Sequence, residues 1–392
     1  MTTTTTRRHV HPFPARMAPD IALGKIIDLK PSRAKVLDPM CGSGTVIRLA
    51  SEAGHAAIGA DLDPLAVLLT RTSAIRSWSS NLTERATQVV EEARTLKPGL
   101  PTWIKDDEET SRFIGYWFDT AQAEDLSRLA RVLADRPRRD DPLRIALSRL
   151  IVTKDAGASL ARDTAHSRPH KTRESNDFDV MSGFIGAAAT IEAIVAGETA
   201  AERPQVRRAD ARSLSFVKSQ TIDLVMTSPP YLNAIDYLRG HRMSLVWLGW
   251  TTHQLRELRG ETIGAERGLK APTAEVAAIA KVSGAELSRM STRHRNMVHR
   301  FARDAHDFCR AVARVTKPSG TVVLVVADSQ LRGVPISNSG VCAAAAKHHD
   351  LKLIKTETRE IPARHRYLPP PEGETSSLAN RMREEVIFTF RR

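Results

Sequence analysis

Two short stretches of the sequence hold side chains whose types and spacing could do chemistry, and each follows an apolar run. The first is Thr-Ser-Pro-Pro-Tyr at residues 227–231, after the apolar segment Ile222–Met226. Neither proline has an N–H, so the carbonyl groups of this corner stay free to accept hydrogen bonds from a ligand, beside a hydroxyl and a flat ring. Such a corner suits a planar substrate that carries an exocyclic amine.

The second stretch is a glycine-containing turn at residues 36–47, which reads Val-Leu-Asp-Pro-Met-Cys-Gly-Ser-Gly-Thr-Val-Ile. The pattern is typical of a strand, a turn and the start of a helix. Glycine lets the backbone approach a ligand closely, and the helix N-terminus behind it suits an anion such as a carboxylate. Ile47 stands where the dinucleotide-binding fingerprint has its third glycine.

Acidic residues follow two further predicted strands. Ala56–Ala60 is followed by Asp-Leu-Asp-Pro at 61–64, and Asp210 stands at a third strand tip. An acidic residue about 20 positions after a glycine turn, at the tip of the second strand, commonly holds ribose hydroxyls. The carboxyl ends of strands in an open parallel sheet converge on one crevice. We therefore expect Asp38, Asp61 and Asp210 to surround one site with the 227–231 corner.

The elements that must position these residues are those of an α/β fold. Strands are also predicted at Ile222–Met226 and Thr321–Asp328, with Leu351–Glu357 and Glu385–Phe390 as a closing antiparallel pair. From Leu65 to about Arg203 helical apolar spacing predominates. Helices are predicted at Pro19–Leu29, Leu82–Leu96, Ala121–Leu133, Pro142–Val152, Phe184–Ala196, Leu238–Trp250, Ala271–Met290, Thr292–Val315 and Val341–His348.

Two segments outside the predicted sheet are strongly basic. Ala158–Ser175 is a long loop that either contacts phosphates or is a solvated linker. Thr292–Val315 is a basic helix that should pack an apolar stripe onto the sheet and present arginines on its other face, and Lys317–Gly320 is predicted to end it. The stripe consists of Met297, Phe301, Phe308 and Val312.

Composition limits the class of protein. The 392 residues, 41% of them hydrophobic, can form a sizeable core, and a net charge of +13 indicates a polyanion partner unless it reflects an arginine-rich proteome. No apolar run is long enough to span a membrane, and the N-terminus lacks a signal-peptide region. Three distant cysteines predict no disulfide and favour the cytoplasm. Nothing near His9 and His11 completes a ligand set, so no metal site is predicted.

Three motifs together give a family resemblance. Residues 38–45, Asp-Pro-Met-Cys-Gly-Ser-Gly-Thr, resemble the cofactor motif of S-adenosylmethionine-dependent amino methyltransferases of DNA. The 227–231 corner is similar to their catalytic motif, in the form most often seen in N4-cytosine enzymes. His-Pro-Phe-Pro-Ala-Arg-Met at 11–17 resembles the motif that precedes the cofactor motif in many of them. The resemblance implies a Rossmann-like class I methyltransferase fold, a seven-stranded sheet with helices on both faces and a reversed last hairpin.

The resemblance also implies a role for each matching residue. The methionine half of the cofactor would be lined by the 38–45 motif, with Phe13 closing that side. Asp61, helped by Asp63, would take the ribose hydroxyls, and Asp210 would meet the adenine amino group. The motif residues concerned are Asp38, Pro39, Met40, Gly42, Gly44 and Thr45, and those that would hold the target base are Ser228, Pro229 through its carbonyl, Pro230 and Tyr231.

The function implied is methyl transfer from S-adenosyl-L-methionine to the exocyclic amine of a flipped base in DNA, at N4 of cytosine or, as the alternative, N6 of adenine. An RNA amino methyltransferase and a non-catalytic nucleic-acid-binding subunit are the rivals. A 5-carbon cytosine enzyme is disfavoured, because none of the cysteines follows a proline. Residues 1–80 and 205–392 would form the catalytic domain. The helical insertion 81–204 and the segment 232–316 would contact DNA, and a restriction endonuclease would be a natural partner.

Overall fold

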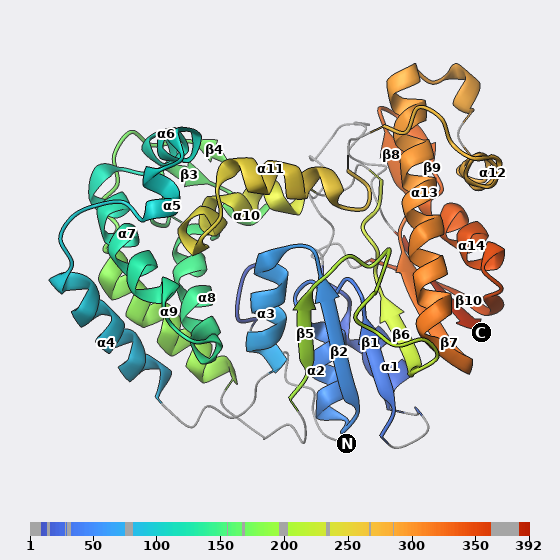
Figure 1. Cartoon of the computed structure of the whole chain (residues 1–392), viewed down its shortest axis with the longest axis horizontal. Helices are drawn as coiled ribbons and strands as arrows, with labels where there is room; N and C mark the ends of the chain where they lie inside the picture. Colours follow the sequence, from blue (N-terminus) through green and yellow to red (C-terminus); the bar gives the residue numbers. More distant parts are fainter. Residues whose placement is uncertain are drawn as a thin grey trace. The chain divides into compact units, whose positions relative to one another are not determined.

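The computed structural model of the chain forms two compact units (Figure 1). A helical unit contains Met1–Pro14, Asp63–Arg203 and Tyr237–Leu258, and a sheet unit contains Ala15–Leu62, Pro204–Asp236 and Arg259–Arg392. The helical unit therefore takes in more than the helical stretch 81–204. The structure describes residues 9–13, 16–27, 29, 33–74, 81–154, 156–166, 169–195, 203–232, 236–265, 268–284, 286–361 and 384–392.

The sheet unit is built on seven strands in the order β10-β11-β7-β6-β1-β2-β5. Neighbours are parallel from β7 to β5, whereas β11 pairs antiparallel with both β10 and β7. Seven strands with a reversed last hairpin confirm the predicted Rossmann-like class I methyltransferase fold. The strands are β1 (Lys35–Asp38), β2 (Ala56–Asp61), β5 (Gln205–Arg208), β6 (Ile222–Thr227), β7 (Thr316–Val326), β10 (Lys352–Glu360) and β11 (Glu384–Arg391).

Helices cover both faces of this sheet. Val225 of β6 and Leu324 of β7 belong to one buried cluster with Phe301 of α13 (Thr292–Val315). Because successive strand residues point to opposite faces, their buried neighbours Leu224 and Val323 face the other side. On that second face α1 (Pro19–Ile26) packs on α2 (Thr45–Glu52). On the first face α12 (Ala274–Lys281) and α14 (Asn338–His348) pack on α13.

Helix α13 has the predicted bounds, and its predicted apolar stripe is buried. Ser291 caps its first turn by accepting the His294 N–H. The predicted end signal, Lys317–Gly320, was wrongly assigned. The helix stops at Val315 and β7 begins at Thr316, so these turn residues form an irregularity inside a strand. There Ile222 and Leu224 of β6 pair with Thr316 and Thr321, and Ser319 adopts a positive φ of 63°.

The helical unit is a bundle around a buried aromatic and aliphatic core. Helix α9 packs on α8 and α4, and α4 also packs on α7. Trp247 is fully buried with its ring edge-on to Phe118, 5.2 Å between centroids. The helices are α3 (Pro64–Ala74), α4 (Leu82–Thr95), α5 (Thr102–Lys105), α6 (Glu108–Trp117), α7 (Thr120–Ala134), α8 (Asp141–Ile151), α9 (Val180–Val195), α10 (Tyr237–Leu245) and α11 (Thr252–Glu261), which runs past the boundary of the unit.

Hydrogen bonds hold the basic segment 158–175 in place, both to a neighbouring helix and within the segment itself. It contains a short antiparallel pair, β3 (Ala161–Arg162) and β4 (His170–Lys171). The Leu160 N–H donates to the Trp117 carbonyl at 2.8 Å, and the Arg173 guanidinium donates to the Ser159 carbonyl at 2.8 Å. The described part of this segment is therefore not a solvated linker, and Arg173 acts as a structural donor.

Two short elements were not predicted because they are only three residues long. Strands β8 (Ser329–Leu331) and β9 (Val334–Ile336) form a hairpin between β7 and α14. Within the described residues, no helix combines the length and the apolar character needed to cross a membrane.

Helix α1 provides a matched test of the fold. Ile26 is fully buried, whereas its neighbour Ile27 is 62% exposed. We expect Ile26→Ala to lower the free energy of unfolding by about 2–5 kcal/mol through loss of packing. Ile27→Ala should change it by less than about 0.5 kcal/mol. Urea unfolding of both variants measures the difference, and equal losses would contradict the placement of α1.

Candidate active site

The glycine turn after β1 requires conformations that favour glycine. Gly42 and Gly44 have φ angles of 48° and 83°, and Gly44 precedes the first residue of α2, Thr45. The Cys41 N–H donates to the Ala60 carbonyl at 2.9 Å, which fastens the turn to the end of β2. A side chain at either glycine would strain the backbone here.

The turn also lies very close to β2, at a glycine that the sequence analysis did not single out. A Cβ atom on Gly59 would lie 3.2 Å from Cγ1 of Ile47 and 3.4 Å from Sγ of Cys41. The first distance is shorter than ordinary van der Waals contact, so α2 and the turn can approach the sheet this closely only because Gly59 has no side chain. The side chain of Ile47, at the position of the missing third glycine, packs against Gly59.

Asp61 is brought directly to the turn. Its Oδ2 accepts the Gly42 N–H at 2.9 Å, and its backbone carbonyl accepts the Ala209 N–H at 3.1 Å. The acidic tip of β2 therefore bridges the glycine turn and the segment after β5. The sequence analysis predicted this grouping from the position of the acid alone.

Asp38 ends β1 and is 3% exposed. Burial raises the pKa of its carboxyl to about 7, and the charge of Asp61 adds to the rise, while the Thr227 side chain and the Met40 N–H oppose it. The Met40 N–H donates to Oδ1 of Asp38 at 3.2 Å. Since β1 and β6 are adjacent parallel strands, the glycine turn and the Ser-Pro-Pro-Tyr corner leave the sheet at neighbouring positions.

The corner is internally bonded. Oγ of Ser228 lies 3.2 Å from the Tyr231 hydroxyl. Burial raises the pKa of Tyr231 above its usual value, so this hydroxyl stays protonated at neutral pH. Pro229 is buried and Pro230 half-buried between them.

Three residues that the sequence analysis missed brace this corner. The Asn338 side chain accepts the Leu232 N–H at 3.3 Å, and Ser329 donates to the Leu232 carbonyl at 2.8 Å. Gly264, with a φ of 77°, passes so close that a Cβ there would lie 2.9 Å from the Tyr231 carbonyl oxygen. No local pattern marks Asn338 or Ser329, because each acts on a segment about 100 residues away.

Asp210 lies at the predicted strand tip, but its carboxylate is already engaged by Arg212. Nε of Arg212 is 3.0 Å from both Asp210 oxygens, and Nη2 is 2.6 Å from Oδ2. Arg212 also donates to the buried Asp304 and to the Glu261 carbonyl, each at 2.8 Å. An amine that reaches Asp210 must therefore displace a guanidinium.

Phe13 and Asp63 belong to the helical unit, where they meet through a histidine. Nδ1 of the fully buried His241 lies 2.6 Å from Oδ2 of Asp63, and the Leu65 N–H donates to the other oxygen at 2.9 Å. The Phe13 ring lies 4.8 Å from the His241 ring and stacks on Tyr237 at 5.7 Å. Asp63 therefore caps α3 and orients His241, a partner that its own surroundings in the sequence did not indicate.

Comparisons with known proteins add little beyond this geometry. No protein-family model and no curated protein matches the chain. Among solved structures, a SAM-dependent methyltransferase from Methanosarcina mazei aligns over 96% of this chain and 99% of its own, at 9% identity and a TM-score of 0.35. TrmN from Thermus thermophilus aligns over 95% of this chain and 48% of its own, so this chain spans about half of its length, at 13% identity and a TM-score of 0.31. Likeness this low carries no functional argument.

The buried Asp38 makes a testable contribution to pH dependence. Because its folded pKa, about 7, lies above its unfolded value, the folded state holds the proton more tightly. The contribution of Asp38 to the free energy of unfolding should therefore be greatest below pH 4. It should fall as the pH rises towards 7, by about 4 kcal/mol at most. Asp38→Asn should remove this fall. Urea unfolding from pH 4 to 8 measures it.

The control for Asp38→Asn is a carboxyl at the surface. Asp135→Asn, at an exposed position after α7, should leave the pH profile of the wild type unchanged. If the pH profiles of the wild type and of Asp38→Asn run parallel over the whole range, the pKa of Asp38 is not raised in the folded state.

Proposed function

We propose that the chain is an S-adenosylmethionine-dependent methyltransferase that acts on the exocyclic amine of a base in DNA, with N4 of cytosine as the favoured target. The observation that carries the proposal is the adjacency of β1 and β6. It puts the glycine turn and the Ser-Pro-Pro-Tyr corner at neighbouring positions on the carboxyl edge, where ligands of open α/β sheets bind.

The residues of the turn fit this cofactor. Gly42 and Gly44 leave the backbone bare at positive φ, and the Asp61 carboxylate lies beside them to accept from ribose hydroxyls. Asp38 supplies a carboxyl next to the same turn. When bound, S-adenosylmethionine supplies an electrophilic methyl group on a positively charged sulfur.

In this proposal the corner makes the base amine, which is a weak nucleophile, more reactive. The lone pair of a base amine is delocalised into the ring. Ser228 Oγ and the Pro229 carbonyl accept the two N–H groups, which favours a pyramidal nitrogen whose lone pair is localised and directed at the methyl group. Tyr231, kept as a phenol, donates to Ser228 and stacks on a flipped base. Catalysis is then mainly positioning: the N–C bond forms as the C–S bond breaks, and the proton of the amine leaves to water.

Substitutions at the corner test this role. Ser228→Ala and Tyr231→Ala should each lower methyl transfer by about 100-fold or more, since each removes a group that positions the amine or the base. Tyr231→Phe keeps the ring and should lose less, about tenfold. Tritium transfer from labelled cofactor to duplex DNA, single-stranded DNA and RNA measures the rates. Mass spectrometry of the modified nucleoside distinguishes N4-cytosine from N6-adenine.

The control is Tyr116→Ala, a tyrosine that is 55% exposed in the helical unit, which should transfer methyl groups like the wild type. Cofactor binding must survive in the corner variants. Full activity in Ser228→Ala and Tyr231→Ala would refute the assigned site. Cofactor binding with no transfer to any nucleic acid would favour a non-catalytic nucleic-acid-binding subunit.

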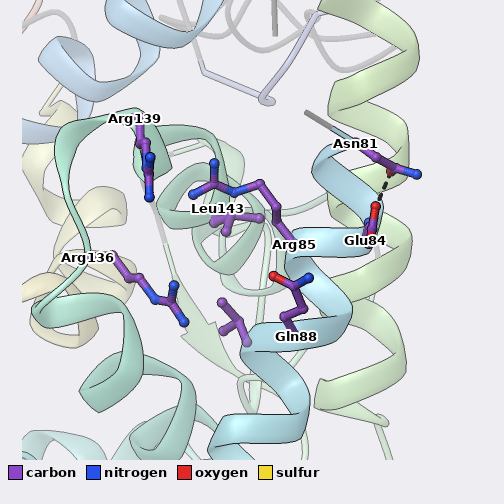
Figure 2. Close-up of a pocket in the computed structure, with 8 residues that line it drawn as sticks. Asn81, Glu84, Arg85, Gln88, Arg136, Arg139 and Leu143 are labelled. Atoms are coloured by element: carbon purple, nitrogen blue, oxygen red, sulfur yellow. Dashed lines mark hydrogen bonds between the residues drawn. The ribbon is translucent and has the colours of Figure 1, made fainter. Parts of the chain in front are cut away.

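An arginine-lined pocket of the helical unit supports a nucleic-acid partner. It has a volume of about 320 Å³ and receives Arg85 from α4 and Arg136 and Arg139 from the turn before α8 (Figure 2). Burial, with the charges of Arg139 and Arg136, lowers the pKa of Arg85. Arg85 pairs with Asp140 and Arg136 with Glu92. Arg139 is exposed and has no ion-pair partner among the described residues, which leaves its guanidinium available to a phosphate.

Substitution of Arg139 tests the phosphate contact. Arg139→Ala should weaken binding to duplexes of any sequence and reduce the slope of log affinity against log salt by about 0.9, because one phosphate contact is lost. Fluorescence anisotropy over a range of salt concentrations measures this slope. Arg112→Ala is the matched control, since Arg112 is exposed in the same unit and pairs with Glu108. Equal slopes for Arg139→Ala and the wild type would exclude this pocket from the interface.

A further inference from the structure

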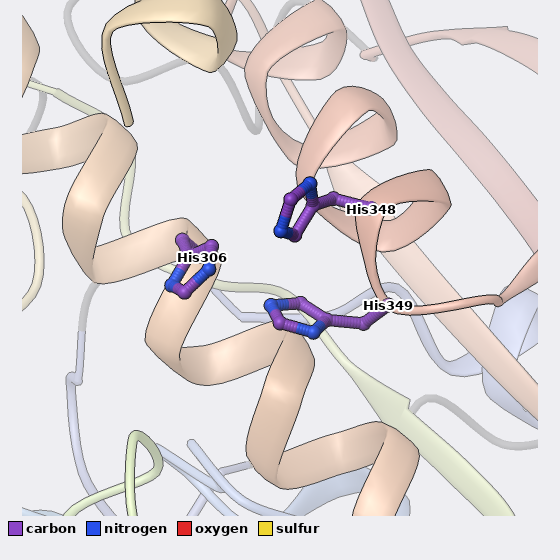
Figure 3. Close-up of side chains that lie close together, drawn as sticks. All are labelled: His306, His348 and His349. Carbon is purple, nitrogen blue, oxygen red and sulfur yellow. The ribbon is translucent and has the colours of Figure 1, made fainter. Parts of the chain in front are cut away.

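Three histidines that no role above uses gather between two helices of the sheet unit. His306 comes from α13, and His348 and His349 come from the end of α14 (Figure 3). One ring nitrogen from each lies within 4.8 Å of the other two, and the ring centroids are 4.5 to 5.2 Å apart. Figure 3 shows the rings turned towards a common point.

The end of α14 explains how two consecutive residues face the same partner. Leu351 donates its N–H to the Ala346 carbonyl at 3.1 Å, and Asp350 adopts a φ of 59°, so the helix closes in a left-handed turn. This ending rotates His349 out of the regular helical position. The C-terminus of a helix carries a partial negative charge, which favours a cation.

Two of the three rings have a nitrogen that is placed to bind a metal ion. Nδ1 of His306 lies 3.2 Å from Oδ1 of Asp307, so this nitrogen donates to the carboxylate and Nε2 presents its lone pair. A carboxylate behind a histidine in this way is typical of metal sites. Nε2 of His349 is buried and has no hydrogen-bond partner among the residues that the structure describes.

A carboxylate beside the cluster offsets part of the positive charge around it. Arg310 and Arg303 are the nearest cations on α13, and both pair with Asp307, at 3.2 and 3.7 Å. Asp307 therefore neutralises part of their charge while it orients His306. Lys347 on α14 is exposed to solvent.

We propose that His306, His348 and His349 bind a divalent transition-metal ion, with zinc as the natural occupant. Imidazole suits zinc, and Zn–N bonds of about 2.0–2.1 Å place tetrahedral nitrogen ligands about 3.3 Å apart. Side-chain rotation brings the three nitrogens from their present separation to that distance, and water completes the coordination. The ion links α13 to α14 and acts on their packing, so the proposal is independent of the methyl-transfer chemistry.

Metal titration of the full chain tests this site, with any polyhistidine tag removed. Calorimetry with zinc chloride at neutral pH should show one tight site per chain, and Co²⁺ should give the absorption of a tetrahedral complex. His306→Ala and His348→Ala should abolish the tight site, and Asp307→Asn should weaken it about tenfold. Zinc should raise the melting temperature of the wild type but not of the two histidine variants, and it should raise that of Asp307→Asn by less.

His294→Ala is the matched control, because His294 lies on the same helix and its ring contacts Ser291. It should bind zinc like the wild type. Circular dichroism of the metal-free variants checks that each is folded. Failure of the wild type to bind zinc, or unchanged zinc binding by the variant with all three cluster histidines replaced by alanine, would overturn the proposal.

Discussion

The hydrogen bond from the Gly42 N–H to the Asp61 carboxylate is the contact on which the sheet edge depends. It requires Gly42 to adopt a positive φ, and it requires the turn to approach β2 where Gly59 has no side chain. The β1–β2 register, which pairs Asp38 with Gly59, then fixes the height of the turn over the sheet. Because β6 pairs with β1 on the other side, the β1–β6 register fixes the place of the corner that holds Ser228.

Three carboxylates meet this edge, and each is accommodated by different physics. Asp38 is removed from water and holds its proton more tightly as a result. Asp61 accepts a backbone N–H, that of Gly42, at the glycine turn. Asp210 is neutralised by the guanidinium of Arg212. Neighbouring carboxylates that were all ionised and unpaired would repel one another. The edge therefore concentrates acidic groups without an accumulation of unpaired charge.

The sequence predicted the elements whose signals are local. Helix α13 was placed to the residue, because its apolar stripe lies within the segment itself. The acid-tipped strands were recognisable from the spacing of Asp61 after the glycine turn. What depends on distant residues was not visible: Asn338 braces Leu232 from 106 residues away, and His241 meets Asp63 across 178. The turn at Lys317–Gly320 misled because proline and glycine mark an interruption, whether of a helix or of a strand.

Arg212 gives the sheet edge a built-in competitor. Its guanidinium occupies both oxygens of Asp210, yet it is also held by Asp304 of α13 and by the Glu261 carbonyl. A ligand amine that takes Asp210 exchanges places with a group that remains tethered to the protein. The apparent affinity of such a ligand equals its intrinsic affinity multiplied by the fraction of molecules in which Asp210 is open. If a ligand amine did take Asp210, its departure would let the Arg212 ion pair re-form, so this carboxylate would have a partner both with and without the ligand.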